Sequence, residues 1–333
     1  MSGIATAAVE QAASRIAELV RPTRLARADA LSQLSGANAY LKLENTQETG
    51  SFKLRGAANA VLRARERGHD ATAGGALRGL VAVSTGNHGR AVAYVGRALG
   101  LSTTVFVSRH VPEDKLEALR DLGADLQVAG DSQDEAEERA VAAATRQGWH
   151  LVHPFDDEDV IAGQGTVGLE LGKQAAESSV VFDVVLVPLS GGGLFSGVAL
   201  GLAAAGSRAR LVAVAMRGGS AMAASLAAGK PTPVAEVATL ADSLQGGLGL
   251  DNRLTFDLVS EHLDDLILLD EGAIARGMVF AYQREGQLLE GAGAVGVAAI
   301  LDAPERFAGQ SVGVIASGGN VPLQKVLDLA ATP

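Results

Sequence analysis

A single lysine, Lys53, lies in the segment "GSFKLRGA" at positions 50–57, where small and aromatic residues lead into a helical pattern. On an exposed helix it would be one of 28 lysines and arginines with no special chemistry. A lysine that loses its hydration has a lowered pKa, and its neutral amine is a nucleophile. What Lys53 can do therefore depends on the groups that surround it.

A glycine-rich turn, "SGGGL" at 190–194, follows the apolar run "FDVVLVPL" at 182–189 and leads into another apolar segment. A strand, a glycine turn and a helix together present backbone N–H groups to a phosphate. An ordinary tight turn is the structural alternative. Because the sequence has no G-x-x-x-x-G-K-[ST] motif, the predicted phosphate need not belong to a nucleotide.

Two further polar segments follow strand-like runs. "STGNHGR" at 84–90 places hydroxyls, an amide and an imidazole at a predicted helix start, which suits a substrate carboxylate. Helix capping by Ser or Thr is the alternative, and a lone histidine such as His88 is more often structural. "SGGN" at 317–320 also follows a strand. Because ligands bind beyond the carboxyl ends of parallel strands, we expect these segments to share one cleft.

Other motifs carry less chemistry. "GAGAVG" at 291–296 matches G-x-G-x-x-G, but the stretch before it has a helical pattern and no acidic residue follows at the expected offset. We therefore predict close packing of a helix N-terminus there. The six histidines show no metal-ligand spacing. The acid pairs Asp156/Asp157 and Asp264/Asp265 are predicted to be solvated loop charges.

The composition limits the class of protein. A chain of 333 residues with 47% hydrophobic residues can form two compact lobes with sizeable cores. A formal net charge of -10, without a basic block, argues against nucleic acids and anionic membranes as partners. The absence of cysteine excludes disulfides and thiolate chemistry. No leader pattern and no membrane-length apolar run is present, so we expect a cytoplasmic protein.

Short apolar runs alternate with helical patterns along the chain. Strands are predicted at 39–44, 79–85, 103–108, 124–130, 182–189, 209–216, 263–270 and 311–318, and helices at 53–68, 87–99, 112–122, 132–147 and 161–176. This alternation predicts an α/β fold of parallel sheets covered on both faces. The polar stretch 68–78 is predicted to be a crossover between lobes. A lysine near a phosphate-bearing cofactor in such a cleft is typical of Schiff-base chemistry.

Six motifs occur in an order that resembles the threonine/serine dehydratase family of fold-type II enzymes, which use pyridoxal 5′-phosphate. They are "KLENTQETGSFKLRGA" (42–57), "STGNHGR" (84–90), "HPFDDEDVIAGQGTVGLE" (153–170), "SGGGLFSG" (190–197), "EGAGAVGVAA" (290–299) and "SGGN" (317–320). The resemblance implies a tryptophan synthase β-like fold of two lobes, each with a mainly parallel twisted sheet. A large cofactor-binding domain would comprise 1–74 and 152–333, and a small substrate-loop domain 75–151.

The resemblance also implies roles for single residues. Lys53 resembles the lysine that holds the cofactor, and Phe52 resembles the aromatic neighbour beside the cofactor ring. Ser190, Gly191, Gly192, Gly193 and Leu194 resemble the phosphate loop, and Asn87 the donor to the phenolic oxygen. Ser84, Thr85, Gly86 and His88 resemble the loop that holds the substrate carboxylate. Ser317 resembles the partner of the pyridine nitrogen, and as a neutral hydroxyl it would leave the ring a weaker electron sink.

These roles imply a dehydratase, or ammonia-lyase, that eliminates water from a 3-hydroxy amino acid and yields a 2-oxo acid and ammonia. Lys53 would remove the α-proton. The details of "STGNHGR", "ADSLQGGLGLDNRLTF" (241–256) and "EGAGAVG" most resemble the hydroxyectoine-utilisation branch, which implies amino-acid catabolism. The family is usually dimeric, so a homodimer is implied. The C-terminal regulatory domain of biosynthetic threonine dehydratases is not expected here.

Four positions depart from the family pattern. Relatives that bind a divalent cation carry acids where this chain has Ala215 and Ala221, so no such metal is predicted. Thr85 stands where related serine racemases use a serine, and its β-branched side chain disfavours racemisation. Ser243 stands where the family more often has glycine. The alternatives are a serine- or aspartate-type racemase, a β-replacement enzyme, an oxidoreductase that uses "GAGAVG", or a non-catalytic binding protein.

Overall fold

A computed structural model describes residues 4–68, 77–84, 86–109, 111, 113–130 and 133–331 of the chain. Its strands are β1 (Leu25–Arg27), β2 (Asn38–Lys42), β3 (Gly79–Val83), β4 (Ser102–Val107), β5 (Asp125–Val128), β6 (His150–Leu151), β7 (Val184–Pro188), β8 (Arg210–Met216), β9 (Asp265–Leu269) and β10 (Ser311–Ile315). Its α-helices are α1 (Thr6–Ile16), α2 (Asp29–Ser35), α3 (Lys53–Glu66), α4 (Asn87–Leu99), α5 (Glu113–Asp121), α6 (Gln133–Gln147), α7 (Glu158–Glu177), α8 (Gly193–Ala204), α9 (Ala221–Ala228), α10 (Thr255–His262), α11 (Glu271–Glu285), α12 (Gly291–Asp302) and α13 (Leu323–Ala331). Short 3₁₀ turns are η1 (Glu44–Thr46), η2 (Asp242–Leu244) and η3 (Pro304–Arg306).

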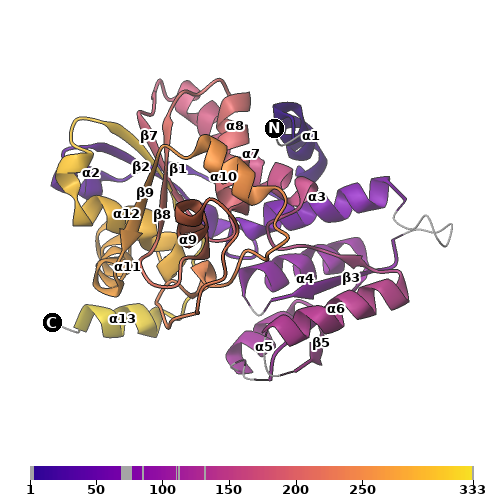
Figure 1. The fold of residues 1–333 in the computed structure, drawn as a ribbon. Helices are drawn as coiled ribbons and strands as arrows, with labels where there is room; N and C mark the ends of the chain where they lie inside the picture. Colours follow the sequence, from indigo (N-terminus) through magenta and orange to yellow (C-terminus); the bar gives the residue numbers. More distant parts are fainter. Residues whose placement is uncertain are drawn as a thin grey trace.

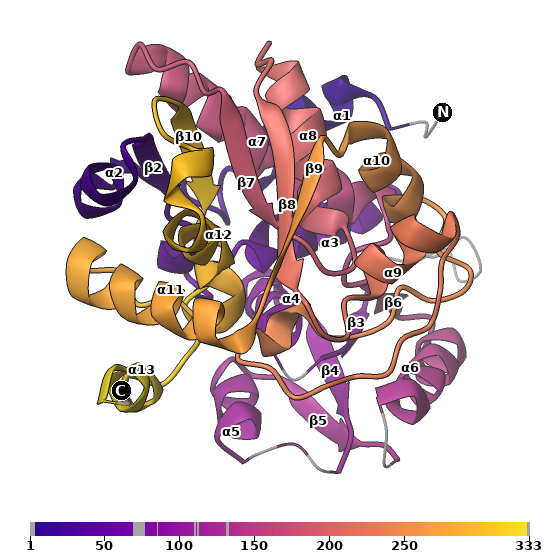
Figure 2. The same cartoon turned by 60° about the vertical axis from the view of Figure 1, so that its left-hand side comes forward.

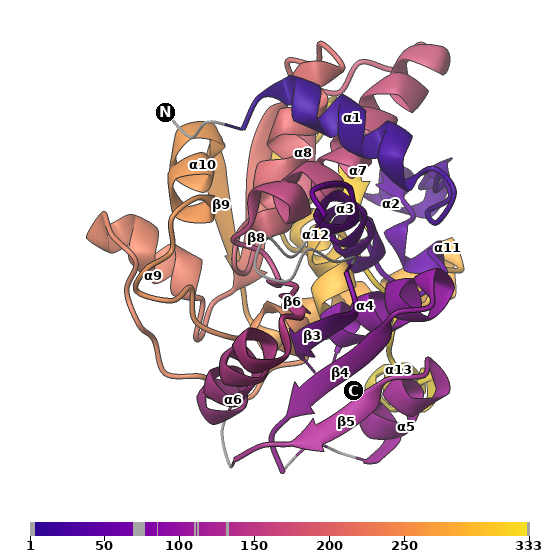
Figure 3. The same cartoon turned by 90° about the vertical axis from the view of Figure 1, so that its right-hand side faces the viewer.

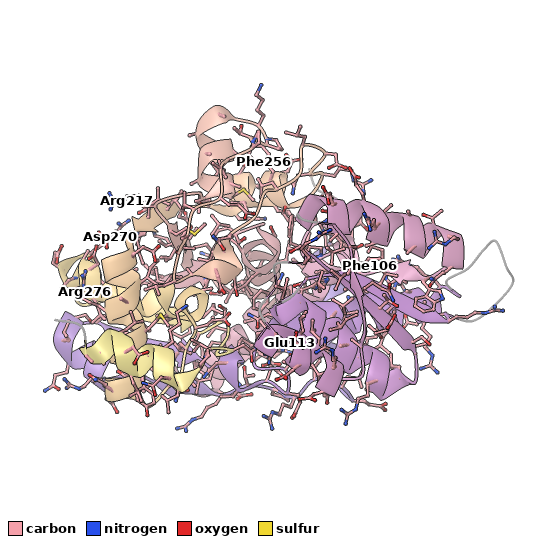
Figure 4. The ribbon with its side chains drawn as sticks, turned by 90° about the horizontal axis from the view of Figure 1, so that it is seen from below. Phe106, Glu113, Arg217, Phe256, Asp270 and Arg276 are labelled. Carbon is pink, nitrogen blue, oxygen red and sulfur yellow. The ribbon has the colours of Figure 1, made fainter. Side chains whose placement is uncertain are left out.

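The strands form two sheets that occupy different halves of the molecule (Figure 1). One has six strands in the order β1-β2-β10-β7-β8-β9, and the other has four in the order β5-β4-β3-β6. Neighbouring strands pair in parallel except β1 with β2, which are antiparallel. Figure 4 places Phe106 of β4 in one half and Arg217 and Asp270 in the other. The predicted fold class is confirmed.

Alternating residues of the large sheet pack in two separate cores. Val184 and Leu186 of β7 belong to a core that contains residues of α2, α11, α12 and α13. Val185 and Val187 belong to a second core, on the opposite face, with residues of α7, α8, α9 and α10. Figure 2 shows β7, β8 and β9 side by side, with α11 and α12 beside them. Helices on both faces explain why these strands are almost continuously apolar in sequence.

The small sheet is covered in the same manner. Leu80 of β3 and Val105 of β4 pack with residues of α3, α4 and α5, whereas Val81 and Phe106 face the core formed with α6. Helix α3, which begins with Lys53, therefore contributes to the core of the small sheet. Helix α1 packs against α7 and α8 (Figure 3).

Most predicted elements are present, with shifts of a few residues at their ends. The antiparallel edge strand β1 and the two-residue strand β6 were not predicted, because each is too short to show a periodic pattern. "GAGAVG" begins α12 and packs closely as predicted, since a Cβ on Gly293 would lie 2.2 Å from the carbonyl oxygen of Gly318. Most of the predicted crossover lies outside the described residues, since 69–76 are not among them.

The prediction that Asp156 and Asp157 are solvated loop charges is wrong. Asp156 accepts hydrogen bonds from the backbone N–H groups at 253–255, at the start of α10. Asp157 is the N-cap of α7 and accepts from Val160 N at 2.9 Å. This cap starts α7 at Glu158, three residues earlier than predicted. Both carboxylates satisfy N–H groups that a helix start leaves unpaired.

Asp264 and Asp265 form specific contacts, although Asp264 is exposed and precedes β9, in agreement with the same prediction. Asp264 accepts from Leu211 N at 2.7 Å, and Asp265 forms an ion pair with Arg306. Both acids lie at the start of β9, where they help to fix the edge of the large sheet. No helix in the described part of the chain combines the length and the apolar character that membrane crossing requires.

A buried ionic cluster ties α3 to the large sheet. Arg55, two residues after Lys53, forms ion pairs with Glu44 at 2.8 Å and Glu170 at 2.7 Å, and its side chain is 1% exposed. Lys42 of β2 also pairs with Glu170, at 2.7 Å. The cluster thus joins β2, η1, α3 and α7. Because removal of one partner leaves a buried charge unpaired, the cluster holds α3 firmly in place.

We predict that Arg55→Met lowers the free energy of unfolding by about 3–5 kcal/mol, because Glu44 is left buried without its partner. Urea unfolding at a fixed cofactor concentration measures the change. Arg276→Ala is the matched control, since the pair of Arg276 with Asp302 is exposed and such pairs contribute at most about 1 kcal/mol. Equal effects of the two substitutions would contradict a structural role for the cluster.

Candidate active site

Lys53 is the first residue of α3, and its side chain points toward the segment that follows β6. Its Nζ donates a hydrogen bond to the carbonyl oxygen of Pro154 at 2.6 Å and lies 5.4 Å from the centre of the Phe52 ring. Burial lowers the pKa of the Lys53 ammonium from the usual 10.5 to about 8. The residue is therefore the desolvated lysine that its sequence context suggested, and a substantial fraction is neutral near pH 8.

The glycine turn at 190–194 connects β7 to α8 and is largely buried. Gly192 has a φ of +87° and is the N-cap of α8, with no side chain capping the helix. A Cβ on Gly192 would lie 2.9 Å from Met222, so the position requires glycine for both conformation and space. Buried N–H groups at an uncapped helix N-terminus attract an anion such as a phosphate.

The segment 152–155 brings Lys53 and the glycine turn together. Pro154 accepts from the amine of Lys53, while the ring of the next residue, Phe155, lies against the turn. A Cβ on Gly191 would be 2.5 Å from that ring, which leaves no room for a side chain. The predicted amine and the predicted anion site therefore both contact the same short segment, Pro154–Phe155. The sequence motif that begins at His153 did not indicate a role for these residues.

Residues 86–90 form the N-cap and first turn of α4. Gly86 is the N-cap without a side-chain cap, and its N–H donates to Oγ of Ser84 at 3.2 Å. Nε2 of His88 lies 2.8 Å from the carbonyl oxygen of Val152. Because a carbonyl only accepts, Nε2 carries the proton. Burial lowers the pKa of His88 to about 3, so the imidazole is neutral at physiological pH. Thr85 lies outside the described residues.

The end of β10 meets the lysine segment through the backbone. Phe52 N donates to the carbonyl oxygen of Ser317 at 3.0 Å, and Ser51 pairs with Gly318 in an antiparallel bridge. Ser317 is 3% exposed. The hydroxyls of Thr49 and Ser51 are buried with no hydrogen-bond partner among the described residues. The motifs at 50–57 and 317–320 are therefore adjacent.

Two residues with a contact to the predicted site were missed as functional residues. Glu290 accepts a hydrogen bond from Nδ2 of Asn87 at 2.6 Å, and Asn320 donates to Oδ1 of Asn87 at 2.6 Å. Both lie in quoted motifs, but their partners are more than 200 residues away in sequence. The signal that marks them is a polar residue beside a glycine motif at the end of a strand or the start of a helix.

The two alanines that replace family acids lie in the large-sheet half. Ala215 is in β8 and Ala221 begins α9, and both are buried. Within the described ranges, no cluster of three or more His, Cys, Asp or Glu side chains is arranged to hold a metal. The prediction of no divalent cation continues to rest on the two alanines.

The groups at this site fit a cofactor that has both an aldehyde and a phosphate. A neutral amine captures the aldehyde, and an uncapped helix N-terminus receives the phosphate. The sequence pattern of the family described as pyridoxal-phosphate dependent enzyme matches residues 16–318. The chain belongs to this family. The predictions of an enzyme and of pyridoxal phosphate as its cofactor are confirmed.

Similar proteins narrow the class within this family. A Sinorhizobium fredii protein that carries the name threonine dehydratase is 44% identical, over 97% of this chain and 94% of its own length. L-threonine ammonia-lyase of Thermotoga maritima is 36% identical, over 96% of this chain and 76% of its own length. The structure of maize serine racemase matches with a TM-score of 0.88 at 32% identity, covering 97% of this chain and 96% of that one. The dehydratase and ammonia-lyase relatives support the predicted lyase class.

The lowered pKa of Lys53 predicts how the rate of cofactor binding depends on pH. The amine captures an aldehyde only when it is deprotonated, so the rate for protein stripped of pyridoxal phosphate should rise with pH and level off above about 8. At pH 8 about half of Lys53 is neutral, against about 0.3% of an ordinary lysine. Stopped-flow absorbance from pH 6 to 10 measures this. A midpoint near 10.5 would contradict the desolvation of Lys53, and Lys173→Ala is the control.

Proposed function

We propose that this protein is a pyridoxal-phosphate-dependent dehydratase that removes water from a 3-hydroxy amino acid and yields a 2-oxo acid and ammonia. The main observation that supports the proposal is that the desolvated amine of Lys53 and the uncapped N-terminus of α8 contact the same segment, Pro154–Phe155. The dehydratase and ammonia-lyase relatives support the reaction type. We also propose a role for each residue of the site.

Five parts of the chain would hold the cofactor. Lys53 binds its aldehyde carbon, Phe52 packs beside its ring, and the turn of Ser190, Gly191, Gly192, Gly193 and Leu194 receives its phosphate on the N–H groups of α8. Asn87 donates to the phenolic oxygen, and Ser317 faces the pyridine nitrogen. When bound, pyridoxal phosphate withdraws electrons from the α-carbon of an attached amino acid.

Lys53 is proposed as the base that removes the α-proton. Burial lowers its pKa to about 8, so the free amine is available near neutral pH and becomes an ammonium as it accepts the proton. The β-hydroxyl leaves with a proton as water, and hydrolysis of the remaining carbon–nitrogen bond releases ammonia. The overall reaction is redox-neutral, because the water lost in elimination is taken up again in hydrolysis.

The start of α4 is proposed to hold the substrate carboxylate. Ser84, Thr85, Gly86 and His88 supply hydroxyls and N–H groups at a helix N-terminus that has no side-chain cap. The imidazole of His88 is engaged with Val152 and neutral, so it positions the loop and does not act as an acid. Replacement of its ring would disturb the junction of α4 with the segment after β6.

Ser317 is proposed to favour elimination over transamination. A hydroxyl does not supply the negative charge that keeps a pyridine nitrogen protonated, so the ring withdraws electrons less strongly. Negative charge at the α-carbon would then be poorly stabilised, so a substrate whose β-hydroxyl can leave would be favoured. This property of Ser317 supports 3-hydroxy amino acids as the substrate class.

The finer assignments go beyond the family. We propose the hydroxyectoine-utilisation branch on the details at 84–90, 241–256 and 290–296, with phenylserine- or 3-hydroxyaspartate-like substrates beside threonine and serine. We further propose a cytoplasmic homodimer without a divalent cation. The large domain would comprise 1–74 and 152–333, and the small domain 75–151.

Amino-acid racemisation is the second candidate, because the fold matches maize serine racemase closely. Racemisation needs a group that returns a proton to the second face of the α-carbon. Related racemases use a serine where this chain has Thr85, whose β-branched side chain has fewer rotamers. Dehydration is therefore the preferred proposal.

We predict that Lys53→Ala lowers kcat by about a thousandfold or more, because both the cofactor linkage and the α-proton acceptor are lost. Lys173→Ala, in which an exposed lysine of α7 is removed, should leave turnover unchanged. A coupled assay for 2-oxo acid and ammonia measures both. Near-normal turnover by Lys53→Ala would refute the mechanism.

A substrate panel tests the function itself. The holoenzyme is incubated with threonine, serine, phenylserine and 3-hydroxyaspartate, and 2-oxo acid is measured together with the chirality of the remaining amino acid. We expect equal amounts of 2-oxo acid and ammonia from at least one member. Accumulation of the opposite enantiomer without 2-oxo acid would establish the racemase instead.

A further inference from the structure

Glu290 is a buried acid whose side chain does not serve the helix that it begins. It is the N-cap of α12, but its carboxylate accepts no hydrogen bond from that helix. The residue is 5% exposed, and its Oε1 accepts from Nδ2 of Asn87 at 2.6 Å. An acid at an N-cap normally bonds to the N–H groups of its own first turn. Glu290 instead contacts a residue that lies 203 positions earlier.

The amide of Asn87 is held at both ends. Its Nδ2 donates to Glu290, and its Oδ1 accepts from Nδ2 of Asn320 at 2.6 Å. The other donor hydrogen of Asn320 is directed to the carbonyl oxygen of Thr49, at 2.8 Å. An asparagine Nδ2 has two hydrogens, so Asn87 retains one after it bonds to Glu290. The network therefore leaves one oriented N–H donor.

Further groups from other segments face the Glu290 carboxylate. Ser243 and the backbone N–H of Asn320 lie near enough to the Glu290 carboxylate to lower its pKa, and Asp242 lies near enough to raise it. Arg90 of α4 donates to Oδ1 of Asn320 at 3.3 Å. Burial raises the pKa of Glu290 to about 7, which the hydrogen bonds from Asn87 and Ser243 partly offset. The ionised form is thus surrounded by donors and is accessible near neutral pH.

We propose that Glu290 is a positioning residue that orients the amide of Asn87 toward the cofactor, with Asn320 holding the other end of that amide. The inference rests on the proposed role of Asn87 as donor to the phenolic oxygen. Ser243 takes part as the residue that replaces the glycine more usual in the family, so this chain has an additional hydroxyl on the network.

The donor pattern explains why a carboxylate is needed. An ionised carboxylate only accepts, so it suits both the NH₂ of Asn87 and the nearby backbone N–H of Asn320. A glutamine offers one acceptor oxygen and one NH₂ group. If its oxygen faces Asn87, its NH₂ faces the N–H of Asn320, and the reverse orientation would oppose the NH₂ of Asn87. In the first orientation Asn87 keeps only a neutral hydrogen bond, and in the second it has no acceptor, so its amide is held less firmly in either case.

The test uses the full chain stripped of its cofactor and reconstituted with pyridoxal phosphate, without substrate. Affinity is measured by fluorescence quenching at pH 8 for wild type, Glu290→Gln, Asn87→Ala and the double variant. We expect Glu290→Gln to weaken cofactor binding about three- to tenfold, the effect of one charge-assisted hydrogen bond. In the Asn87→Ala background the same change should have no effect, because Glu290 acts through Asn87.

Equal weakening in both backgrounds, or none in either, would overturn the proposal. Glu285→Gln is the matched control, since Glu285 is another partly buried acid whose pKa burial raises and which accepts a backbone N–H, from Leu31. It should leave cofactor affinity unchanged. Because no substrate is present, a wrong assignment of the dehydratase reaction would not alter these results.

Ser243→Ala gives a second, milder test if Glu290→Gln does not fold. Loss of the hydroxyl raises the pKa of Glu290 further, so the ionised form is reached at higher pH. Cofactor affinity of the wild type should change with pH as Glu290 ionises, and this change should be absent in Glu290→Gln and Asn87→Ala. In Ser243→Ala the change should occur at a higher pH than in the wild type. An unchanged pH dependence would overturn the role of Ser243 in the network.

Discussion

The buried ion pairs of Arg55 fix the helix that carries the reactive lysine. The apolar side of α3, with Leu54 and Ala57, belongs to the core of the small sheet. Arg55 is bound instead to Glu44 and Glu170, beside β2 of the large sheet. Helix α3 is thus held from both halves, by apolar burial on one side and by charge on the other. Because unpairing a buried charge is costly, Lys53 at the helix start has little freedom to move.

Burial lowers the pKa of the basic groups at the site and raises that of the acid, so the neutral form of each group is favoured. It lowers the pKa of Lys53 to about 8 and that of His88 to about 3, and it raises that of Glu290 to about 7. In each case the neutral form is favoured, since a charge loses hydration in the interior. An anionic cofactor phosphate is then met by N–H dipoles of α8, whose N-terminus has no side-chain cap.

The proposed division between dehydration and racemisation depends on small differences within one fold. The fold matches both a serine racemase and a threonine deaminase, and the relatives in sequence likewise include dehydratase, ammonia-lyase and serine racemase names. In the proposed mechanism, Lys53 would serve as the base in both reactions. The two reactions would differ in whether a second proton donor faces the opposite side of the α-carbon and in how strongly the cofactor withdraws electrons. Thr85 and Ser317 are the residues proposed to set these two properties.

The sequence alone determined the parallel α/β class, the strand–turn–helix around 190–194, and Lys53 as the candidate amine. These follow from local periodicity and from glycines whose steric needs are visible in the chain. The tertiary structure alone decided that Pro154 accepts from Lys53, that Phe155 packs on the glycine turn, and that Glu290 holds Asn87. No local pattern encodes these contacts, because each joins residues about 40 to 200 positions apart. The pKa shifts of Lys53 and Glu290 arise from burial, and a side chain becomes buried only when the chain folds.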